Sequence, residues 1–248
     1  MTSRRQPIIK TTQTAPGLRW PQLIPGILEK RYKRFMADVR LKDGSMVTAH
    51  CPNSGSMKAC SEPGRTVYLS FADNPKRKLK YTWELIRMPN SLVGVNTLVP
   101  NRLVFHGIQA GRIPALSGYD RITREVKVGT GSRIDLMLQN KQGKRCYVEV
   151  KNCTLVEDNT ARFPDAVTER GLKHLLELRK RVRKGDRCVM FYLIQRMDAT
   201  AFSPADQIDP AYGKTLRRVV KDGVDILAYD VKIDLKRIRL RNPIPIVL

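Results

Sequence analysis

Short segments that alternate between apolar and polar residues fill the first third of the chain. Four of them, each seven to nine residues long, carry β-branched or aromatic side chains: RFMADVRL, SMVTAHC, RTVYLSFA and KYTWELIRM. Turn residues such as Asp43-Gly44 and Pro63-Gly64 separate several of these segments, as is typical between β-strands. Short strands at this spacing predict a small closed sheet, such as an OB-like barrel, over residues 21–90.

After about residue 90 the pattern changes to longer apolar segments and helical periods. Helices are predicted at about 100–110, 167–183 and 209–222, and the first two are followed by glycine-containing stops. The strands predicted in this part are RITREVKVG, SRIDLMLQ, RCYVEVKNCTL, VMFYLIQ and VDILAYDVKI. The order α-β-β-β-α-β-α-β predicts a mixed sheet flanked by helices. We therefore expect an α/β protein with an N-terminal all-β domain and a second domain over residues 91–248.

The long helix predicted at 167–183 carries a row of apolar residues at helical spacing. The row consists of Leu172, Leu175, Leu176 and Val182, with Leu178 at its edge. Arg170 and His174 are four residues apart and share a face outside that row. Two interpretations of this pair are open: a solvated helix surface, or contacts with the phosphates of DNA.

The charge of the chain indicates an anionic partner. Its 46 Lys and Arg residues exceed its 23 Asp and Glu residues, which gives a formal net charge of +23 over 248 residues. Nucleic acid is the commonest partner of so basic a chain, ahead of an acidic membrane surface or an acidic protein. Because no apolar run approaches the roughly 20 residues of a membrane span, we expect no membrane partner. The pattern leaves open whether the chain forms a homo-oligomer.

Cysteine usage and the N-terminus favour a cytoplasmic protein. The five cysteines are odd in number and none has CxxC spacing, which indicates reduced, mostly buried thiols. A zinc site at His50, Cys51 and Cys60 is disfavoured because their spacing fits no standard zinc site. The first residues are polar and basic without an apolar core segment, so a flexible leader over residues 1–20 is predicted rather than a secretory signal.

The segment RCYVEVKNCTL contains two charges that a strand places on one side. Glu149 and Lys151 lie two residues apart, about 6.6 Å along a strand, and share a face, while Val148 and Val150 face the core. Asp135 lies in the preceding predicted strand, and pairing across the hairpin brings it beside Glu149. Two carboxylates and a lysine form a site for a hard divalent cation such as Mg²⁺ or Mn²⁺. The alternative is an ion pair on an exposed sheet face.

The arrangement resembles the catalytic site of PD-(D/E)xK nucleases. The spacing from Asp135 to Glu149 and Lys151 is D-x13-E-x-K, and the surrounding order of elements strengthens the match. We expect Asp135 and Glu149 to bind the metal ion, Lys151 to act in catalysis, and Glu125, one strand earlier, to supply a third catalytic and metal-binding carboxylate. Glu125 has an alternative role as an ion-pair partner of Arg124, Lys127 or Arg133.

Longer motifs resemble the sugar fermentation stimulation protein A family. They are RYKRFMADV, AHCPNSGSM, NPKRKLKYTWEL, GVNT, SRIDLML, YVEVKNCTL and FPDAVTERGLKHLLEL, and the resemblance covers about residues 26–229. It implies an N-terminal OB-like domain, a C-terminal PD-(D/E)xK-like domain and DNA binding without sequence preference. It also implies a link to sugar metabolism, especially that of maltose, in bacteria. The nuclease-like site that it implies consists of Glu125, Asp135, Glu149 and Lys151.

Two basic segments of the predicted barrel are expected to bind DNA, either single- or double-stranded. OB-like barrels bind strands through basic grooves and stacking aromatic side chains. The expected contacts are Arg31, Tyr32, Lys33 and Arg34 in the first segment and Lys76, Arg77, Lys78 and Lys80, beside Tyr81 and Trp83, in the second. Solvated surface patches are the alternative. The role of the HCPNSGS loop at 50–56 stays open.

Three functions are consistent with these features. The first is a DNA-binding protein with a Mg²⁺-dependent phosphodiesterase site, and the intact set of Asp135, Glu149 and Lys151 favours it. The second is a DNA-binding regulatory protein without catalytic activity, which the resemblance to the family favours. The third is a basic protein associated with RNA or the ribosome.

Overall fold

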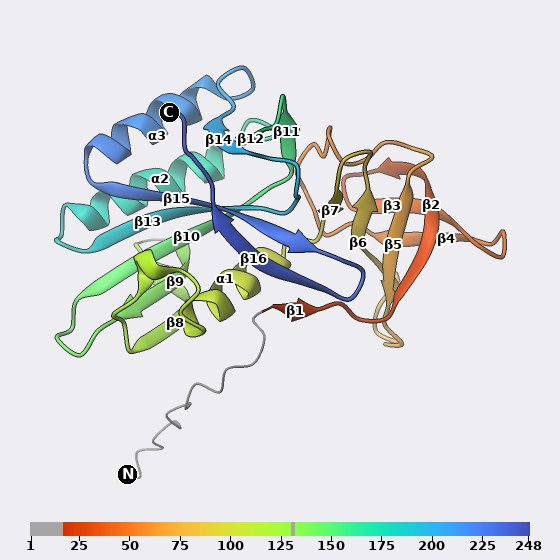
Figure 1. Cartoon of the computed structure of the whole chain (residues 1–248), viewed down its shortest axis with the longest axis horizontal. Coiled ribbons are helices and arrows are strands. Elements are labelled where there is room, and N and C mark those ends of the chain that lie inside the picture. The colour runs from red at the N-terminus through yellow and green to blue at the C-terminus, as the bar shows by residue number, and fades with distance from the viewer. Residues whose placement is uncertain (1–16, 130–131) are drawn as a thin grey trace, which may run out of the picture.

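The computed structural model describes residues 17–129 and 132–248, and the N-terminal part of these forms a small barrel (Figure 1). Its strands are β2 (Leu23–Tyr32), β3 (Met36–Leu41), β4 (Met46–His50), β5 (Thr66–Phe71), β6 (Tyr81–Arg87) and β7 (Leu92–Gly94). They lie in the order β4-β3-β2-β5-β6-β7, and a pairing between β4 and β6 closes the barrel. The predicted OB-like barrel is confirmed, and buried residues such as Leu28, Val39 and Trp83 fill its core.

A seven-stranded mixed sheet forms the centre of the second domain. In spatial order its strands are β1 (Leu18–Arg19), β16 (Arg237–Pro243), β15 (Val224–Ile233), β13 (Arg187–Ile194), β10 (Arg145–Cys153), β9 (Ser132–Gln139) and β8 (Arg121–Val128). The three central strands β10, β13 and β15 run parallel, and the strands on either side pair antiparallel. A small separate sheet contains β11 (Leu155–Glu157), β12 (Thr160–Phe163) and β14 (Ala201–Pro204). The predicted mixed sheet is confirmed.

Helices cover both faces of the large sheet (Figure 1). One face is covered by α1 (Val99–Gln109), which the short 3-10 helix η1 (Pro114–Leu116) follows, and the other face by α2 (Glu169–Val182) and α3 (Pro210–Lys221). The first turns of α2 and α3 are capped by Thr168 and Asp209, whose side-chain oxygens accept a backbone N–H. No helix in the described part of the chain is both long enough and apolar enough to cross a membrane.

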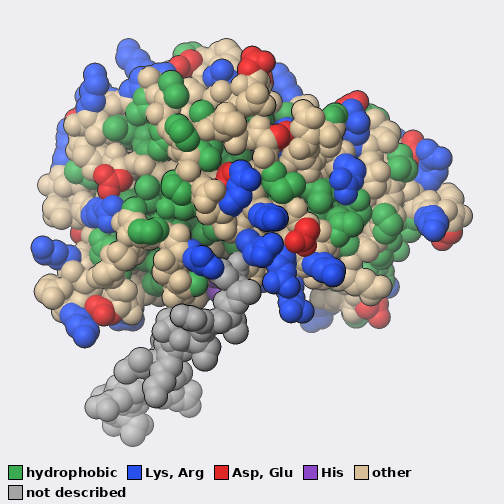
Figure 2. Space-filling model, in the orientation of Figure 1, with side chains coloured by type: hydrophobic (Ala, Val, Ile, Leu, Met, Phe, Trp, Pro, Cys, Tyr) green, Lys and Arg blue, Asp and Glu red, His purple; other side chains and the backbone are tan. Residues whose placement is uncertain are grey.

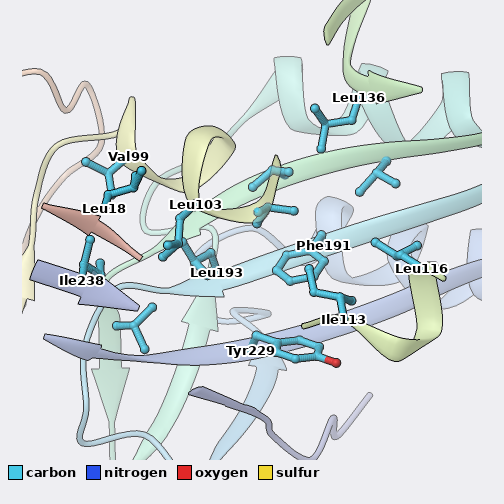
Figure 3. Packing of buried hydrophobic residues seen from close by; sticks show 14 of the residues in the cluster. Leu18, Val99, Leu103, Ile113, Leu116, Leu136, Phe191, Leu193, Tyr229 and Ile238 are labelled. Carbon is cyan, nitrogen blue, oxygen red and sulfur yellow. The ribbon is translucent and has the colours of Figure 1, made fainter. Parts of the chain in front are cut away.

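Alternating side chains of the central strands fill a core on each side of the sheet. Phe191 and Leu193 of β13 face α1 and pack in a cluster with Leu103 (Figure 3). Tyr192, between them in sequence, belongs to the opposite cluster together with Leu175 of α2. Because strand residues alternate between faces, the uninterrupted apolar segment of β13 is explained by burial on both sides.

The fold differs from the sequence-based prediction at several points, and it contains strands that the sequence pattern did not predict, among them β2, β14 and β16. In α2 the buried face contains His174, Leu175 and Leu178, whereas Leu176 is 39 % exposed. Packing against α3 and β13 therefore selects a face that is rotated from the predicted apolar row. The end of the predicted leader is also ordered, because Leu18–Arg19 forms β1 and satisfies its backbone groups by pairing with β16. The earlier part of the leader lies outside the described residues.

Direct hydrogen bonds join the barrel to the second domain. The Gly94 N–H donates to the carbonyl of Gln195 at 2.8 Å. The Ser56 hydroxyl donates to the Asp165 carbonyl at 2.6 Å, and the Met57 N–H donates to the Asp165 carboxylate at 3.0 Å. Both Ser56 and Met57 lie in or beside the HCPNSGS loop, so this loop attaches the barrel to the segment that leads into α2.

Candidate active site

The hairpin of β9 and β10 places Asp135 against the backbone of β10. The two strands pair as far as Val148↔Leu136, where the ladder ends. Beyond that point the Val150 N–H donates to Oδ2 of Asp135 at 2.8 Å. The carboxylate therefore accepts the hydrogen bond that a backbone carbonyl of the neighbouring strand would otherwise accept. A buried N–H requires such an acceptor. This bond holds Asp135 beside Glu149, as the predicted hairpin pairing requires.

Glu149 and Lys151 form a buried cluster with a residue of α2. Their side chains are 2 % and 13 % exposed, and Nζ of Lys151 donates to Oε1 of Glu149 at 2.7 Å. Nδ1 of His174 contacts the same carboxylate oxygen and lies 3.1 Å from the Lys151 nitrogen. Since buried charges require partners, the strand can carry both charges because each has at least one polar partner within the cluster. The alternative of an exposed ion pair does not apply here.

The pKa values of the two carboxyl groups shift in opposite directions. Burial raises the pKa of Asp135 to about 6, and the negative charge of Glu149 adds to this effect. Burial also raises the pKa of Glu149, but Lys151 and His174 outweigh it and lower that pKa overall. Because Asp135 resists ionisation next to Glu149, a cation between them would stabilise the state in which both are ionised.

The cluster has oxygen atoms with unused acceptor capacity. Oε2 of Glu149 is buried and has no hydrogen-bond partner among the described residues, which is costly for a carboxylate oxygen. Oδ1 of Asp135 accepts one bond, from Nδ2 of Asn101 in α1 at 2.7 Å. Hard divalent cations bind carboxylate oxygens and retain several water molecules. Asp135 and Glu149 therefore fit an ion such as Mg²⁺ or Mn²⁺.

Glu125, predicted as a third carboxylate of the site, lies exposed in β8. Its two neighbours pair with β9, but Glu125 itself is skipped in the register and has a φ of 52°. This conformation is uncommon for a residue other than glycine, but the register is the same on both sides of it, since Arg124 pairs with Leu136 and Val126 with Ile134. Among the described residues, no three His, Cys, Asp or Glu side chains form a metal-binding group. The role of Glu125 stays a prediction.

The two α2 residues predicted to contact phosphates lie in different environments. His174 is 6 % exposed and contacts Glu149 and Lys151, so it serves the cluster rather than the surface. Arg170, one turn earlier, is exposed at the start of the helix. A phosphate contact of Arg170 stays a prediction. The sequence pattern marks His174 as a site residue but assigns it to the wrong face, because the predicted buried face of α2 is rotated from the observed one.

Asn101 is a residue of the site that sequence reasoning did not find. It lies in the first turn of α1, 34 positions before Asp135, and its side-chain amide donates to the Asp135 carboxylate. No periodicity relates the start of one helix to the interior of a distant strand. Its only sequence signal is its place shortly after the GVNT motif, at the boundary of the two domains.

Comparisons with known proteins find relatives over most of the chain. Residues 98–237 match the family described as the sugar fermentation stimulation protein RE domain, and residues 30–95 match the SfsA N-terminal OB domain. A sugar fermentation stimulation protein homolog of Geobacter sulfurreducens is 56 % identical over 225 residues, which cover 91 % of this chain and 96 % of the relative. The chain belongs to the sugar fermentation stimulation protein family.

Two further members of this family match the chain over more than nine-tenths of its length. The homolog of Pelobacter propionicus is 54 % identical over 231 residues, which cover 93 % of this chain and all of the relative. The solved structure of Pyrococcus furiosus SfsA in complex with Ca²⁺ has a TM-score of 0.87 and 26 % identity, over 95 % of this chain and 100 % of that chain. The two-domain fold is therefore that of the family, and Ca²⁺ is the ion named for that relative.

The first basic segment of the OB domain is only partly available for binding DNA. The guanidinium of Arg31 donates, at distances between 2.8 and 3.1 Å, to the backbone carbonyls of Arg34, Asn53, Gly55 and Ser56. Arg31 therefore organises the HCPNSGS loop. The Tyr32 hydroxyl donates to the Asp38 carboxylate at 3.0 Å. Lys33 and Arg34 are exposed in the turn between β2 and β3, and their contact with DNA stays a prediction.

The second basic segment lies in the loop between β5 and β6. Lys76 and Lys78 are exposed, whereas Arg77 donates to the Thr82 hydroxyl at 2.8 Å. Lys80 lies 3.5 Å from a carboxylate oxygen of Asp73, in an exposed ion pair that contributes little to stability. The side chains of this segment project from an irregular loop, and their contact with DNA stays a prediction.

One of the aromatic side chains predicted beside the basic segments is buried, and two others are exposed there. Trp83 is fully buried in the barrel core, and its indole N–H donates to the Leu85 carbonyl at 3.0 Å. The expectation that Trp83 stacks beside the basic segment is therefore wrong. Phe35 and Phe71 are 49 % and 45 % exposed, and the Phe71 ring packs edge-on against Tyr81. These two phenylalanines are exposed beside the basic segments, whereas Tyr32 and Tyr81 are half-buried.

Proposed function

We propose that this chain is a metal-dependent phosphodiesterase that acts on DNA without sequence preference. The observation that carries the proposal is the largely buried cluster of Asp135, Glu149 and Lys151, in which Oε2 of Glu149 has no hydrogen-bond partner among the described residues. Two carboxylates of this kind bind Mg²⁺ or Mn²⁺. A lysine beside them supplies a positive charge that stabilises negative charge on a bound phosphate. The same three residue types form the site of PD-(D/E)xK nucleases, so hydrolysis of a phosphodiester is the reaction that fits.

Each residue of the cluster has a definable role in this reaction. When bound, the cation would supply Lewis-acid stabilisation of charge on the phosphate. The Lys151 ammonium, held by Glu149, stabilises negative charge that develops on the phosphate oxygens. Asn101 orients Asp135 and His174 orients Glu149, as partners of metal-binding carboxylates do. The site therefore combines two cation-binding oxygens, one ammonium group and two orienting side chains.

The barrel supplies a surface for the DNA. Pairings of β3 with β4, β4 with β6 and β5 with β6 bring the β2–β3 turn and the β5–β6 loop to one end of the barrel. Exposed cations of both segments and the exposed rings of Phe35 and Phe71 lie at this end. Bases stack on such rings while lysine and arginine contact the phosphates. The net charge of +23 supports a polyanionic partner.

Cleavage of labelled single- and double-stranded DNA in Mg²⁺ or Mn²⁺ tests the proposal, with labelled RNA as a second substrate. Asp135→Asn and Lys151→Met are compared with Asp225→Asn and Lys141→Met, which make the same changes at exposed positions. We expect the wild type and the two surface variants to cleave DNA, and the cluster variants to lose about 100-fold or more in rate while they still bind it. Binding without cleavage by the wild type in either metal would contradict a catalytic role and leave a DNA-binding protein.

A further inference from the structure

Three strands at one edge of the large sheet carry a cationic face that the proposed catalytic site does not include. β1, β16 and β15 are neighbours at this edge. Leu18, Ile233 and Ile238, one from each strand, belong to the core against α1. Alternate residues of the same strands point to the opposite side. We call this side the β16 basic face, and it consists of Arg19, Lys232, Arg237, Arg239 and Arg241.

The register of the strands places like charges directly opposite one another on this face. Arg19 pairs with Arg237 across β1 and β16, and Lys232 pairs with Arg239 across β15 and β16. Directly opposed like charges destabilise an antiparallel pair. Two such pairs on adjacent strands would both be relieved by an anion that lies across them.

Carboxylates of the chain neutralise only part of this charge. Asp230 is buried and accepts a hydrogen bond from Nε of Arg241 at 2.7 Å. Asp234 lies 4.0 Å from Arg239, at the limit of an ion pair. Among the described residues no ion pair is formed by the other three cations, which are Arg19, Lys232 and Arg237. Five cations therefore face two carboxylates, which leaves three positive charges in excess.

The hairpin that carries the face is held in place. The Trp20 N–H donates to the Lys236 carbonyl at 3.1 Å, and the Trp20 indole N–H donates to the Asp234 carbonyl at 2.9 Å. Figure 2 shows Lys and Arg side chains gathering over the region where Figure 1 places β1 and the β15–β16 hairpin. A cationic surface on fixed strands loses little conformational entropy when it binds.

We infer that the β16 basic face binds the phosphate backbone of duplex DNA that flanks the bond held at the Asp135–Glu149–Lys151 cluster. This inference rests on the proposed function. β15 and β13 separate β16 from β10, so the face lies about 14 Å across the sheet from the cluster strand. Duplex DNA carries a negative charge about every 1.7 Å along its axis, so a duplex that spans both places presents several phosphates to the face. The face thus contributes binding affinity and orients the duplex on the protein, but it adds no sequence preference.

The test compares a triple variant of the face with a triple variant of equal charge change. The face variant is Arg19→Gln, Lys232→Gln and Arg237→Gln. The control variant is Lys141→Gln, Lys144→Gln and Arg145→Gln, whose exposed side chains lie at the β9–β10 hairpin, before the cluster in β10. Fluorescence anisotropy measures the binding of a labelled duplex of about 30 base pairs over a range of salt concentrations. Thermal unfolding confirms that both variants fold.

We expect the slope of log K against log salt to become shallower by about 2 to 3 in the face variant, because each phosphate that a cation neutralises adds about 0.9 to the slope. The control should keep a slope near the wild-type value. Equal slopes in the two variants would overturn the inference, while DNA binding by the wild type would keep the proposed function. Absence of DNA binding by all three proteins would overturn both. Loss of binding to phosphatidylserine vesicles by the face variant, with DNA binding intact, would assign the face to a membrane and overturn the inference.

Discussion

Nδ1 of His174 on α2 contacts Oε1 of Glu149 on β10, although the two residues are 25 positions apart in the chain. Lys151 donates to the same oxygen, while Oε2 has no hydrogen-bond partner among the described residues. A carboxylate that is held through one oxygen and free at the other is oriented for a cation. The helix therefore contributes to the site by fixing a side chain of the sheet.

Removal of His174 should weaken metal binding. His174→Ala takes away the contact that orients Glu149, and loss of such an orienting partner reduces metal affinity by about 10- to 100-fold. Isothermal titration calorimetry with Mn²⁺ measures the effect, and Leu176→Ala, an exposed position on the same helix, serves as the control. Equal Mn²⁺ affinity in His174→Ala and wild type would show that Glu149 is oriented without the histidine.

Asp135 should make stability depend on pH in the absence of metal. Burial and the charge of Glu149 raise its pKa from 3.8 to about 6, so the folded chain holds this proton more tightly than the unfolded chain. The resulting stabilisation is present below about pH 4 and is lost as the pH rises through about 6. Relative to wild type, Asp135→Asn should gain about 2 to 3 kcal/mol between pH 4 and pH 7. Urea unfolding at both pH values measures this, and a difference independent of pH would contradict the prediction.

Trp83 and Phe71 should separate stability from DNA binding. Trp83→Ala leaves a cavity in the barrel core and should lower the free energy of unfolding by about 3 to 5 kcal/mol. Phe71→Ala removes a ring that is 45 % exposed and should lower the free energy of unfolding by only about 1 kcal/mol, through the lost contact with Tyr81. It should weaken the binding of single-stranded DNA by about 1 to 3 kcal/mol, the contribution of a base stacked on this ring. Chemical unfolding and anisotropy titrations measure the two effects. Unchanged DNA binding in Phe71→Ala would remove this ring from the proposed DNA surface.

Arg31 should control the order of the HCPNSGS loop. Its planar guanidinium donates to four backbone carbonyls, a geometry that an ammonium group does not reproduce. Arg31→Lys should therefore speed hydrogen exchange of the Gly55 and Met57 amides, of which the latter joins the barrel to Asp165. Lys33→Gln, at an exposed position in the neighbouring turn, should leave exchange unchanged. Equal exchange in both variants would mean that the loop is held by its other contacts.

The sequence by itself determined the kinds of elements and the centre of the site. Alternation and turn residues are local signals, and they predict the barrel, the mixed sheet and three helices correctly. The register of a hairpin is also local, because a short loop fixes which residues of two strands are opposite. For this reason the spacing from Asp135 to Glu149 and Lys151 was sufficient to predict that these residues lie together.

Only the tertiary structure decided which face of a helix is buried and which partner each polar side chain contacts. A helical period permits more than one buried face, and contacts of α2 with α3 and β13 selected the one that contains His174. Barrel closure buried Trp83, and the HCPNSGS loop took up the guanidinium of Arg31. Asn101 reaches Asp135 only because α1 packs across the sheet. These choices depend on contacts between residues far apart in the chain, and no local pattern records them.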